Sequence, residues 1–153
     1  MSKLILFVCT GNTCRSPMAE YYFNHKVNKV NQDGGGFRFK AVSRGLHAEV
    51  GGSIAANARQ ILLDNDIADI SHAPAQVDAE IMREAAFVYG VTQNHANFLS
   101  ELFPDCAGKI RAMPSYIGDP YGSNLEVYAA CFEKIACAVD MIIGELRGMA
   151  CAE

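Results

Sequence analysis

The chain has 153 residues, of which 50% are apolar and 20% charged, and its formal net charge is −4 with a pI near 5.5. These values are typical of one globular domain with a sizeable core, which we expect to span residues 1–153. The acidic balance argues against a nucleic-acid-binding protein, and no apolar run is long enough for a membrane span or a signal peptide.

The cysteines do not follow the pattern of a disulfide framework. There are six of them, and such a framework is typical of a small secreted domain, which nothing in this sequence indicates. Cys131 and Cys137 fall in an apolar helical pattern, where a free cysteine behaves as a small hydrophobic residue. No Cys-x-x-Cys pair and no histidine spacing indicates zinc, so we expect neither a metal nor a cofactor. We therefore predict a reduced, cytoplasmic monomer without a nucleic-acid or membrane partner.

The elements of the first half begin with an apolar run over Lys3–Val8, which predicts a buried strand. A polar loop follows, and the apolar spacing then becomes helical, with Ser16 as a good N-cap and Pro17 in the first turn. Residues 31–36 form a glycine-rich turn, and Phe37–Ser43 alternates as a second strand does.

The second half continues the alternation of helices and strands. The sequence predicts a helix over Ile54–Leu63, a buried strand over Ala85–Val91, a helix over Asn94–Phe103, a short strand over residues 108–113 and a long helix through Tyr128–Leu146. This order predicts an α/β fold, a single-domain three-layer sandwich with a four-stranded parallel sheet and helices on both faces. Ligands of such sheets bind at the carboxyl ends of the strands, where the loop after the first strand lies.

That loop has the composition of an anion site built around a cysteine. A strand, a tight loop and a helix N-terminus bring N–H groups and the helix dipole together, and neither a Walker A ending nor a G-x-G-x-x-G fingerprint is present. Cys9 opens the loop and Arg15 follows six residues later. Both the N–H groups and Arg15 would favour the thiolate and hold phosphate oxygens, with phosphorus over the sulfur. The pattern predicts covalent phosphoryl transfer without a metal, and the alternative is a buried structural cysteine.

Two motifs resemble one known family. The segment VCTGNTCRSPMAE resembles the Cys-x5-Arg-Ser-Pro signature of the low-molecular-weight protein tyrosine phosphatases, and DPYG at Asp119–Gly122 resembles their acid loop. The resemblance implies phosphorylated protein substrates and a cysteinyl-phosphate formed on Cys9. It implies that Arg15 holds the phosphate and that Asp119 protonates the leaving group and then activates water.

The resemblance also assigns roles to residues around these three. Phosphate would bind among the loop residues Thr10, Gly11, Asn12, Thr13, Cys14 and Ser16. Four residues match positions that brace the loop, namely Asn12, which tolerates a left-handed conformation, Ser16, which would hydrogen-bond the thiolate, Ser43 and His72. Tyr121 and His47 would wall the substrate slot, although simple packing is an equal reading of Tyr121. Cys14 matches a cysteine that could form a reversible disulfide with Cys9, and a plain filler role stays equally open.

Alternative functions are a thioredoxin-coupled arsenate reductase and a catalytically silent phosphate-binding module. The reductase needs two further cysteines in mid-chain, and none occurs here between Cys14 and Cys106. The substrate is also open between phosphotyrosine and phosphoarginine. Many tyrosine-directed members of the family have isoleucine where this chain has Thr13, whereas the related arginine phosphatases carry threonine in a CTGNTCRSP loop like this one.

Overall fold

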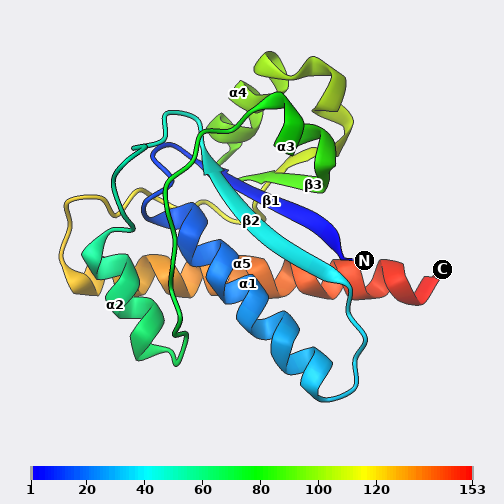
Figure 1. The fold of residues 1–153 in the computed structure, drawn as a ribbon, viewed down its shortest axis with the longest axis horizontal. Helices are drawn as coiled ribbons and strands as arrows, with labels where there is room; N and C mark the ends of the chain where they lie inside the picture. The colour runs from blue at the N-terminus through cyan, green and yellow to red at the C-terminus, as the bar shows by residue number, and fades with distance from the viewer. Residues whose placement is uncertain (1, 153) are drawn as a thin grey trace.

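A four-stranded parallel sheet forms the centre of the molecule (Figure 1). The structure is a computed structural model that describes residues 2–152. Its strands are β1 (Lys3–Cys9), β2 (Phe39–Gly45), β3 (Ala85–Gly90) and β4 (Ile110–Ala112), in the order β2-β1-β3-β4. The predicted parallel sheet is confirmed, and β1 lies between two neighbouring strands with its carboxyl end at Cys9.

Helices cover both faces of the sheet, as predicted (Figure 1). One face carries α1 (Arg15–Gln32), α2 (Ala56–Asp64) and α5 (Leu125–Ala152), and the other carries α3 (Ala79–Glu84) and α4 (Gln93–Leu102). A 3-10 helix, η1 (Pro104–Lys109), joins α4 to β4. No helix within residues 2–152 combines the length and apolarity needed to cross a membrane.

The side chains of β1 alternate between two hydrophobic cores. Ile5 and Phe7 pack in the core under α1 and α5, whereas Leu6 and Val8 pack in the core that includes residues of α3 and α4. All four are fully buried, which explains why this strand reads as a continuous apolar run. The same alternation directs Cys9 toward the α1 side, at the end of the central strand.

Helix α1 begins one residue before the predicted N-cap. Its N-cap is Cys14, and Arg15 is already helical, so the prediction for Ser16 is wrong. The Ser16 hydroxyl instead accepts a hydrogen bond from the Asn12 side chain and lies 2.9 Å from the Cys9 sulfur. Pro17 lies in the first turn as expected, where its missing N–H leaves no helical bond unmade.

Strand β2 lies two residues later than predicted, from Phe39 to Gly45. The Asn31 side chain bonds both the N–H and the C=O of Phe37, which holds that residue in the turn before the strand. The strand then continues to Gly45, where a Cβ would approach the Thr10 carbonyl oxygen to 2.7 Å. Glycine therefore lets the end of β2 pass closely against the loop that follows β1.

The structure contains two short helices that the sequence did not predict, and one cysteine is exposed where burial was expected. Helix α3, capped by the Asp78 side chain, and η1 each have six residues, too few for a periodic apolar pattern to appear. Cys131 is buried as expected, but Cys137 is exposed on α5, so its predicted hydrophobic role is wrong. The remaining predicted elements are present with boundaries shifted by a few residues.

Candidate active site

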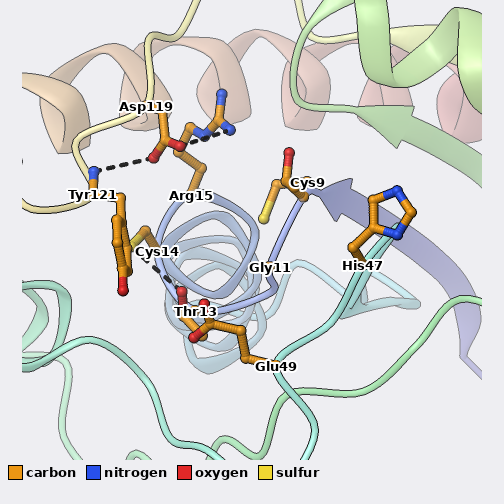
Figure 2. A pocket seen from close by; sticks show the side chains of 10 residues that line it. Cys9, Gly11, Thr13, Cys14, Arg15, His47, Glu49, Asp119 and Tyr121 are labelled. Carbon is orange, nitrogen blue, oxygen red and sulfur yellow. Dashed lines mark hydrogen bonds and ion pairs between the residues drawn. The ribbon is translucent and has the colours of Figure 1, made fainter.

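A pocket of about 170 Å³ opens at the carboxyl end of β1 (Figure 2). The predicted residues that line it are Cys9, Thr10, Gly11, Thr13, Cys14, Arg15, Asp119 and Tyr121, together with His47. Glu49 also lines it and was not predicted. The two segments that the sequence analysis singled out, which are about 110 residues apart, thus meet at one pocket.

Cys9 lies at the junction of β1 and the loop, with only 3% of its surface exposed. Its sulfur contacts the Ser16 hydroxyl at 2.9 Å, which agrees with the hydrogen bond predicted for that serine. The Ser16 oxygen accepts from the Asn12 amide, and its own hydrogen has two acceptors in reach, the sulfur at 2.9 Å and the Arg44 carbonyl at 3.5 Å, of which the sulfur is the nearer. This contact and the free N–H groups of the first turn of α1 converge on the sulfur.

Arg15 joins the loop to the segment that carries Asp119. The Arg15 side chain is buried, and its guanidinium donates from Nη1 to the Ile117 carbonyl at 3.1 Å and lies with Nη2 3.8 Å from Asp119 Oδ2. The Asp119 side chain is 56% exposed, and its Oδ1 accepts the Tyr121 N–H at 3.0 Å. A carboxyl group held in this way faces the pocket while water and a leaving group can still reach it.

Asn12 connects the loop to α1, to β2 and to the segment around Ala75. Its backbone has φ of 61°, the left-handed conformation expected of it. Its amide donates to Ser16 and Ser43 at 2.9 Å each and accepts the N–H of Ala75 at 2.9 Å. His72 Nε2 donates to the Asn12 carbonyl, and burial lowers the pKa of this imidazole. The four bracing residues named from the sequence therefore form one network around the loop.

Replacing Asn12 with alanine is expected to lower the free energy of unfolding by about 3 kcal/mol or more. Alanine loses the three amide hydrogen bonds and is strained at positive φ. Asn12→Gly should lose about 1 kcal/mol less, because glycine adopts this φ without strain. Urea unfolding of both variants measures the difference, with exposed Asn28→Ala on α1 as control. Equal unfolding midpoints for Asn12→Ala and wild type would contradict the bracing role.

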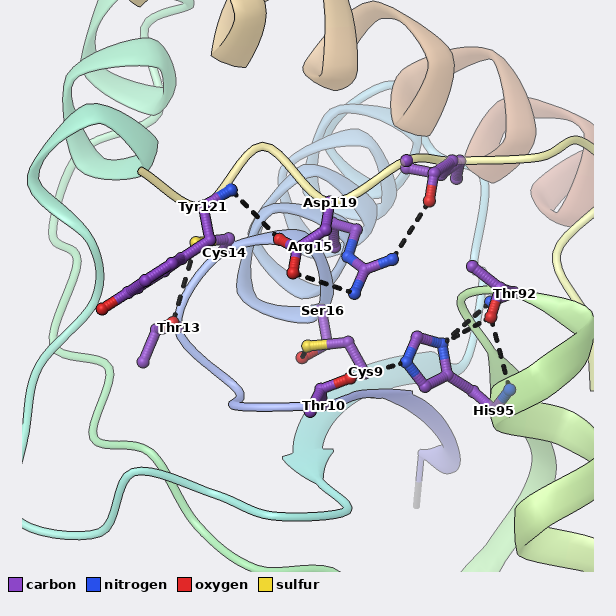
Figure 3. A network of polar contacts seen from close by, with 12 residues as sticks. Cys9, Thr10, Thr13, Cys14, Arg15, Ser16, Thr92, His95, Asp119 and Tyr121 are labelled. Atoms are coloured by element: carbon purple, nitrogen blue, oxygen red, sulfur yellow. Dashed lines mark hydrogen bonds and ion pairs between the residues drawn. The ribbon is translucent and has the colours of Figure 1, made fainter. Parts of the chain in front are cut away.

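A second network, absent from the predictions, reaches the loop from α4 (Figure 3). His95 Nδ1 accepts the backbone N–H of Thr92 at 3.1 Å, so Nε2 carries the hydrogen and donates to Thr10 Oγ1 at 3.0 Å. Burial, followed by the charge of Arg15, lowers the pKa of His95 to about 4, which keeps the ring neutral at physiological pH. The sequence does contain a signal for this N-cap. Thr92 follows a predicted strand, and His95 stands three residues later, where the partner in a capping box lies.

Cys14 lies beside the nucleophile position but points into a different environment. Its thiol is buried, 3.2 Å from the Tyr128 hydroxyl and 3.6 Å from Thr13 Oγ1, and this burial raises its pKa. Cys9 and Cys14 are both free thiols in this structure. Their reversible pairing stays a prediction.

Comparison with known proteins explains why these elements occur together. Residues 4–148 match the family model described as low molecular weight phosphotyrosine protein phosphatase. The chain belongs to that family. The phosphatase is 31% identical to a protein-arginine-phosphatase of Geobacillus stearothermophilus, over 96% of this chain and 98% of that protein. It is 27% identical to the low molecular weight protein-tyrosine-phosphatase PtpB of Staphylococcus haemolyticus, over 94% and 96%.

The fold of this phosphatase is also that of a solved family member. The crystal structure of a low molecular weight protein tyrosine phosphatase from T. tengcongensis superposes with a TM-score of 0.87 at 32% identity, covering 94% of this chain and 99% of that chain. The predicted family, fold and enzyme class are confirmed, and the comparisons favour a protein phosphatase over the reductase alternative.

Proposed function

We propose that this phosphatase hydrolyses phosphoarginine in proteins through a cysteinyl-phosphate on Cys9. The observation that carries the substrate assignment is Thr13, which lines the pocket together with Cys9 and Arg15. Threonine offers an oxygen acceptor to the N–H groups of a guanidinium, whereas isoleucine would leave them unpaired. The names of two relatives, protein-arginine-phosphatases at 31% and 30% identity, support the same substrate.

The first chemical step transfers the phosphoryl group to the enzyme. The Cys9 thiolate attacks phosphorus, so an S–P bond forms while the P–N bond of phosphoarginine breaks. The electron pair of that bond goes to the guanidine nitrogen, which receives a proton from the Asp119 carboxyl group. Arg15 and the N–H groups of residues 10–15 hold the phosphoryl oxygens while the phosphoryl group passes from nitrogen to sulfur.

The second step returns the enzyme to its starting state. A water oxygen attacks phosphorus while the Asp119 carboxylate takes a proton from that water molecule. The S–P bond breaks, and its electron pair returns to the Cys9 sulfur. Inorganic phosphate leaves, and Asp119 again carries the proton that it gave up in the first step. Ser16, which contacts the sulfur at 2.9 Å, stabilises the thiolate as the leaving group.

One comparison tests the proposed substrate. We expect kcat/KM to be higher on a phosphoarginine peptide than on a phosphotyrosine peptide of otherwise identical sequence, measured by phosphate release at neutral pH. A higher value on the phosphotyrosine peptide would overturn the substrate assignment while leaving the cysteinyl-phosphate mechanism in place.

Thr13→Ile is expected to shift that preference toward phosphotyrosine. Losing a hydrogen bond to a charged group costs about 1.5–3 kcal/mol, so phosphoarginine turnover should fall roughly 10- to 150-fold while phosphotyrosine turnover is spared or rises. Thr13→Ser keeps the hydroxyl and should keep the preference. Thr13→Val removes the hydroxyl at similar volume and should shift the preference as Thr13→Ile does. If the ratio of the two kcat/KM values is the same in wild type and Thr13→Ile, residue 13 does not discriminate.

The proposal also includes a cytoplasmic location and a monomeric state. A thiol nucleophile at Cys9 and its neighbour Cys14 both stay reduced in a compartment such as the cytoplasm, where thiols are protected from oxidation. A monomer leaves the mouth of the pocket, where Tyr121 is 64% exposed, open to a protein substrate.

A further inference from the structure

The rim of the pocket carries a carboxylate that the chemistry of phosphate transfer does not use. Glu49 lines the pocket together with Thr13, and both approach Gly11, where a Cβ would lie 3.6 Å from Thr13 Oγ1 and 3.7 Å from Glu49 Cγ. Figure 2 shows Glu49 and Thr13 along one side of the opening, with Asp119 and Arg15 along another. A substrate entering between them meets the Glu49 carboxylate as well as the Asp119 side chain.

Hydrogen bonds hold the backbone of Glu49 beside the loop. The N–H groups of Leu46, His47 and Glu49 donate to the carbonyls of Cys9, Thr10 and Gly11 at 2.9, 2.9 and 3.1 Å. The Gln76 side chain bonds the same segment from its other side, accepting the N–H of Ala48 and donating to the carbonyl of Leu46. Residues 46–49 therefore run along the loop, and the Glu49 side chain starts from a fixed backbone position at the rim of the pocket.

The charge of Glu49 opposes the anion that the loop binds. Among residues 2–149, whose side chains the structure describes, no lysine or arginine lies within ion-pair distance of Glu49. An unpaired carboxylate near a phosphate dianion weakens its binding, since like charges repel across a few ångströms. The cost is offset only when the bound molecule brings a positive group to the same side of the pocket. A phosphorylated guanidinium brings one on the nitrogens next to phosphorus, and a phosphorylated phenol brings none.

We infer that Glu49 is a specificity-determining residue, whose carboxylate accepts hydrogen bonds from the guanidinium of the substrate and disfavours phosphoesters that bring no positive group; this rests on the proposed function. Thr13 and Glu49 then act on the same group from neighbouring positions of one wall. Thr13 supplies an uncharged acceptor inside the pocket, and Glu49 supplies the charge at its rim. Glu49 takes no part in bond breaking, so its effect lies in the choice of substrate.

The test replaces Glu49 with glutamine, which keeps the size of the side chain and removes its charge. We expect kcat/KM on a phosphoarginine peptide to fall about two- to fivefold, the upper part of the range for an exposed charge pair. On the matched phosphotyrosine peptide it should stay constant or rise up to about threefold. Inorganic phosphate should inhibit the variant at a lower concentration than wild type, because the repulsion is gone. The control is Glu84→Gln, an exposed carboxylate at the opposite, amino-terminal end of β3, which should change none of the three.

The outcomes separate this inference from the proposed function. If wild type prefers phosphoarginine and Glu49→Gln leaves both the substrate ratio and the phosphate inhibition unchanged, the inference fails and the function stands. Equal losses on both peptides would assign Glu49 a structural role in the loop and also overturn the inference. If wild type prefers phosphotyrosine, the proposed substrate is wrong. Glu49 then discriminates against phosphotyrosine only if Glu49→Gln accelerates it, and otherwise the inference fails too.

Discussion

Cys9→Ser is expected to reduce turnover by at least about 10,000-fold, the scale on which removal of a nucleophile acts in covalent catalysis. Serine retains a hydrogen-bonding group next to Ser16 and the same loop, so phosphate should still bind. Its hydroxyl stays protonated at neutral pH and is a far weaker nucleophile than a thiolate. Phosphate release measures the loss, and isothermal titration with inorganic phosphate measures retained binding.

A second cysteine provides the control for this experiment. Cys137 is exposed on α5 outside the pocket, so Cys137→Ser should keep the wild-type rate. Acid quenching of wild type during turnover should yield a phosphorylated peptide that contains Cys9, and mass spectrometry identifies it. Near-normal hydrolysis by the Cys9→Ser variant would refute the mechanism. A wild-type protein that binds phosphate and turns over neither substrate would favour the silent phosphate-binding module.

Removal of the acid is expected to have the next largest effect. Asp119→Ala should slow hydrolysis of phenyl phosphate by roughly 100- to 10,000-fold, the usual contribution of a general acid. The loss on p-nitrophenyl phosphate should be clearly smaller, because that leaving group departs without a proton. The ratio of the two losses is the measurement, since a change in binding alone would lower both rates equally.

Asp119→Asn separates proton transfer from position. The asparagine oxygen can still accept the Tyr121 N–H at the place of Oδ1, so the segment should keep its shape. It carries no proton to donate as an acid, and the dependence on leaving group should match that of the alanine variant. If Asp119→Asn is as active as wild type on phenyl phosphate, another group is the acid.

The sequence predicts the structure well where a single physical requirement, such as burial on both faces of a strand, determines which residue types occur. The run before Cys9 is apolar throughout because both faces of β1 are buried, and such a run cannot be mistaken for a loop. The spacing from Cys9 to Arg15 is fixed by the number of residues that a loop needs to surround a phosphate, so it too is visible in the sequence. The meeting of Arg15 with the Asp119 segment followed from the family resemblance and not from local pattern.

The unpredicted residues take their places from contacts between segments. Glu49 belongs to the site only because residues 46–49 pair with the loop after β1, and this pairing depends on where β2 ends. The alternating pattern predicts that β2 ends at Ser43, two residues before its actual end, so this extension is not visible in the sequence. His95 reaches Thr10 across 85 residues through a helix N-cap, and no periodicity reports such a contact. A serine at the start of a helix is usually its cap, which predicts that role for Ser16, but in the structure its hydroxyl contacts the Cys9 thiol and the Asn12 amide instead.

The attachment of the Cys9 loop decides how the nucleophile is reached. The loop continues the central strand, is paired along residues 46–49, and is bonded from below through Asn12. Opening it would break these backbone and side-chain hydrogen bonds together, which makes its local opening costly in free energy. Alkylating agents and oxidants therefore arrive at the sulfur through the mouth of the pocket, on the route that substrate takes. The rate at which a reagent modifies this thiol therefore measures whether the mouth of the pocket is occupied. The rate of inactivation by heat measures the stability of the sheet instead.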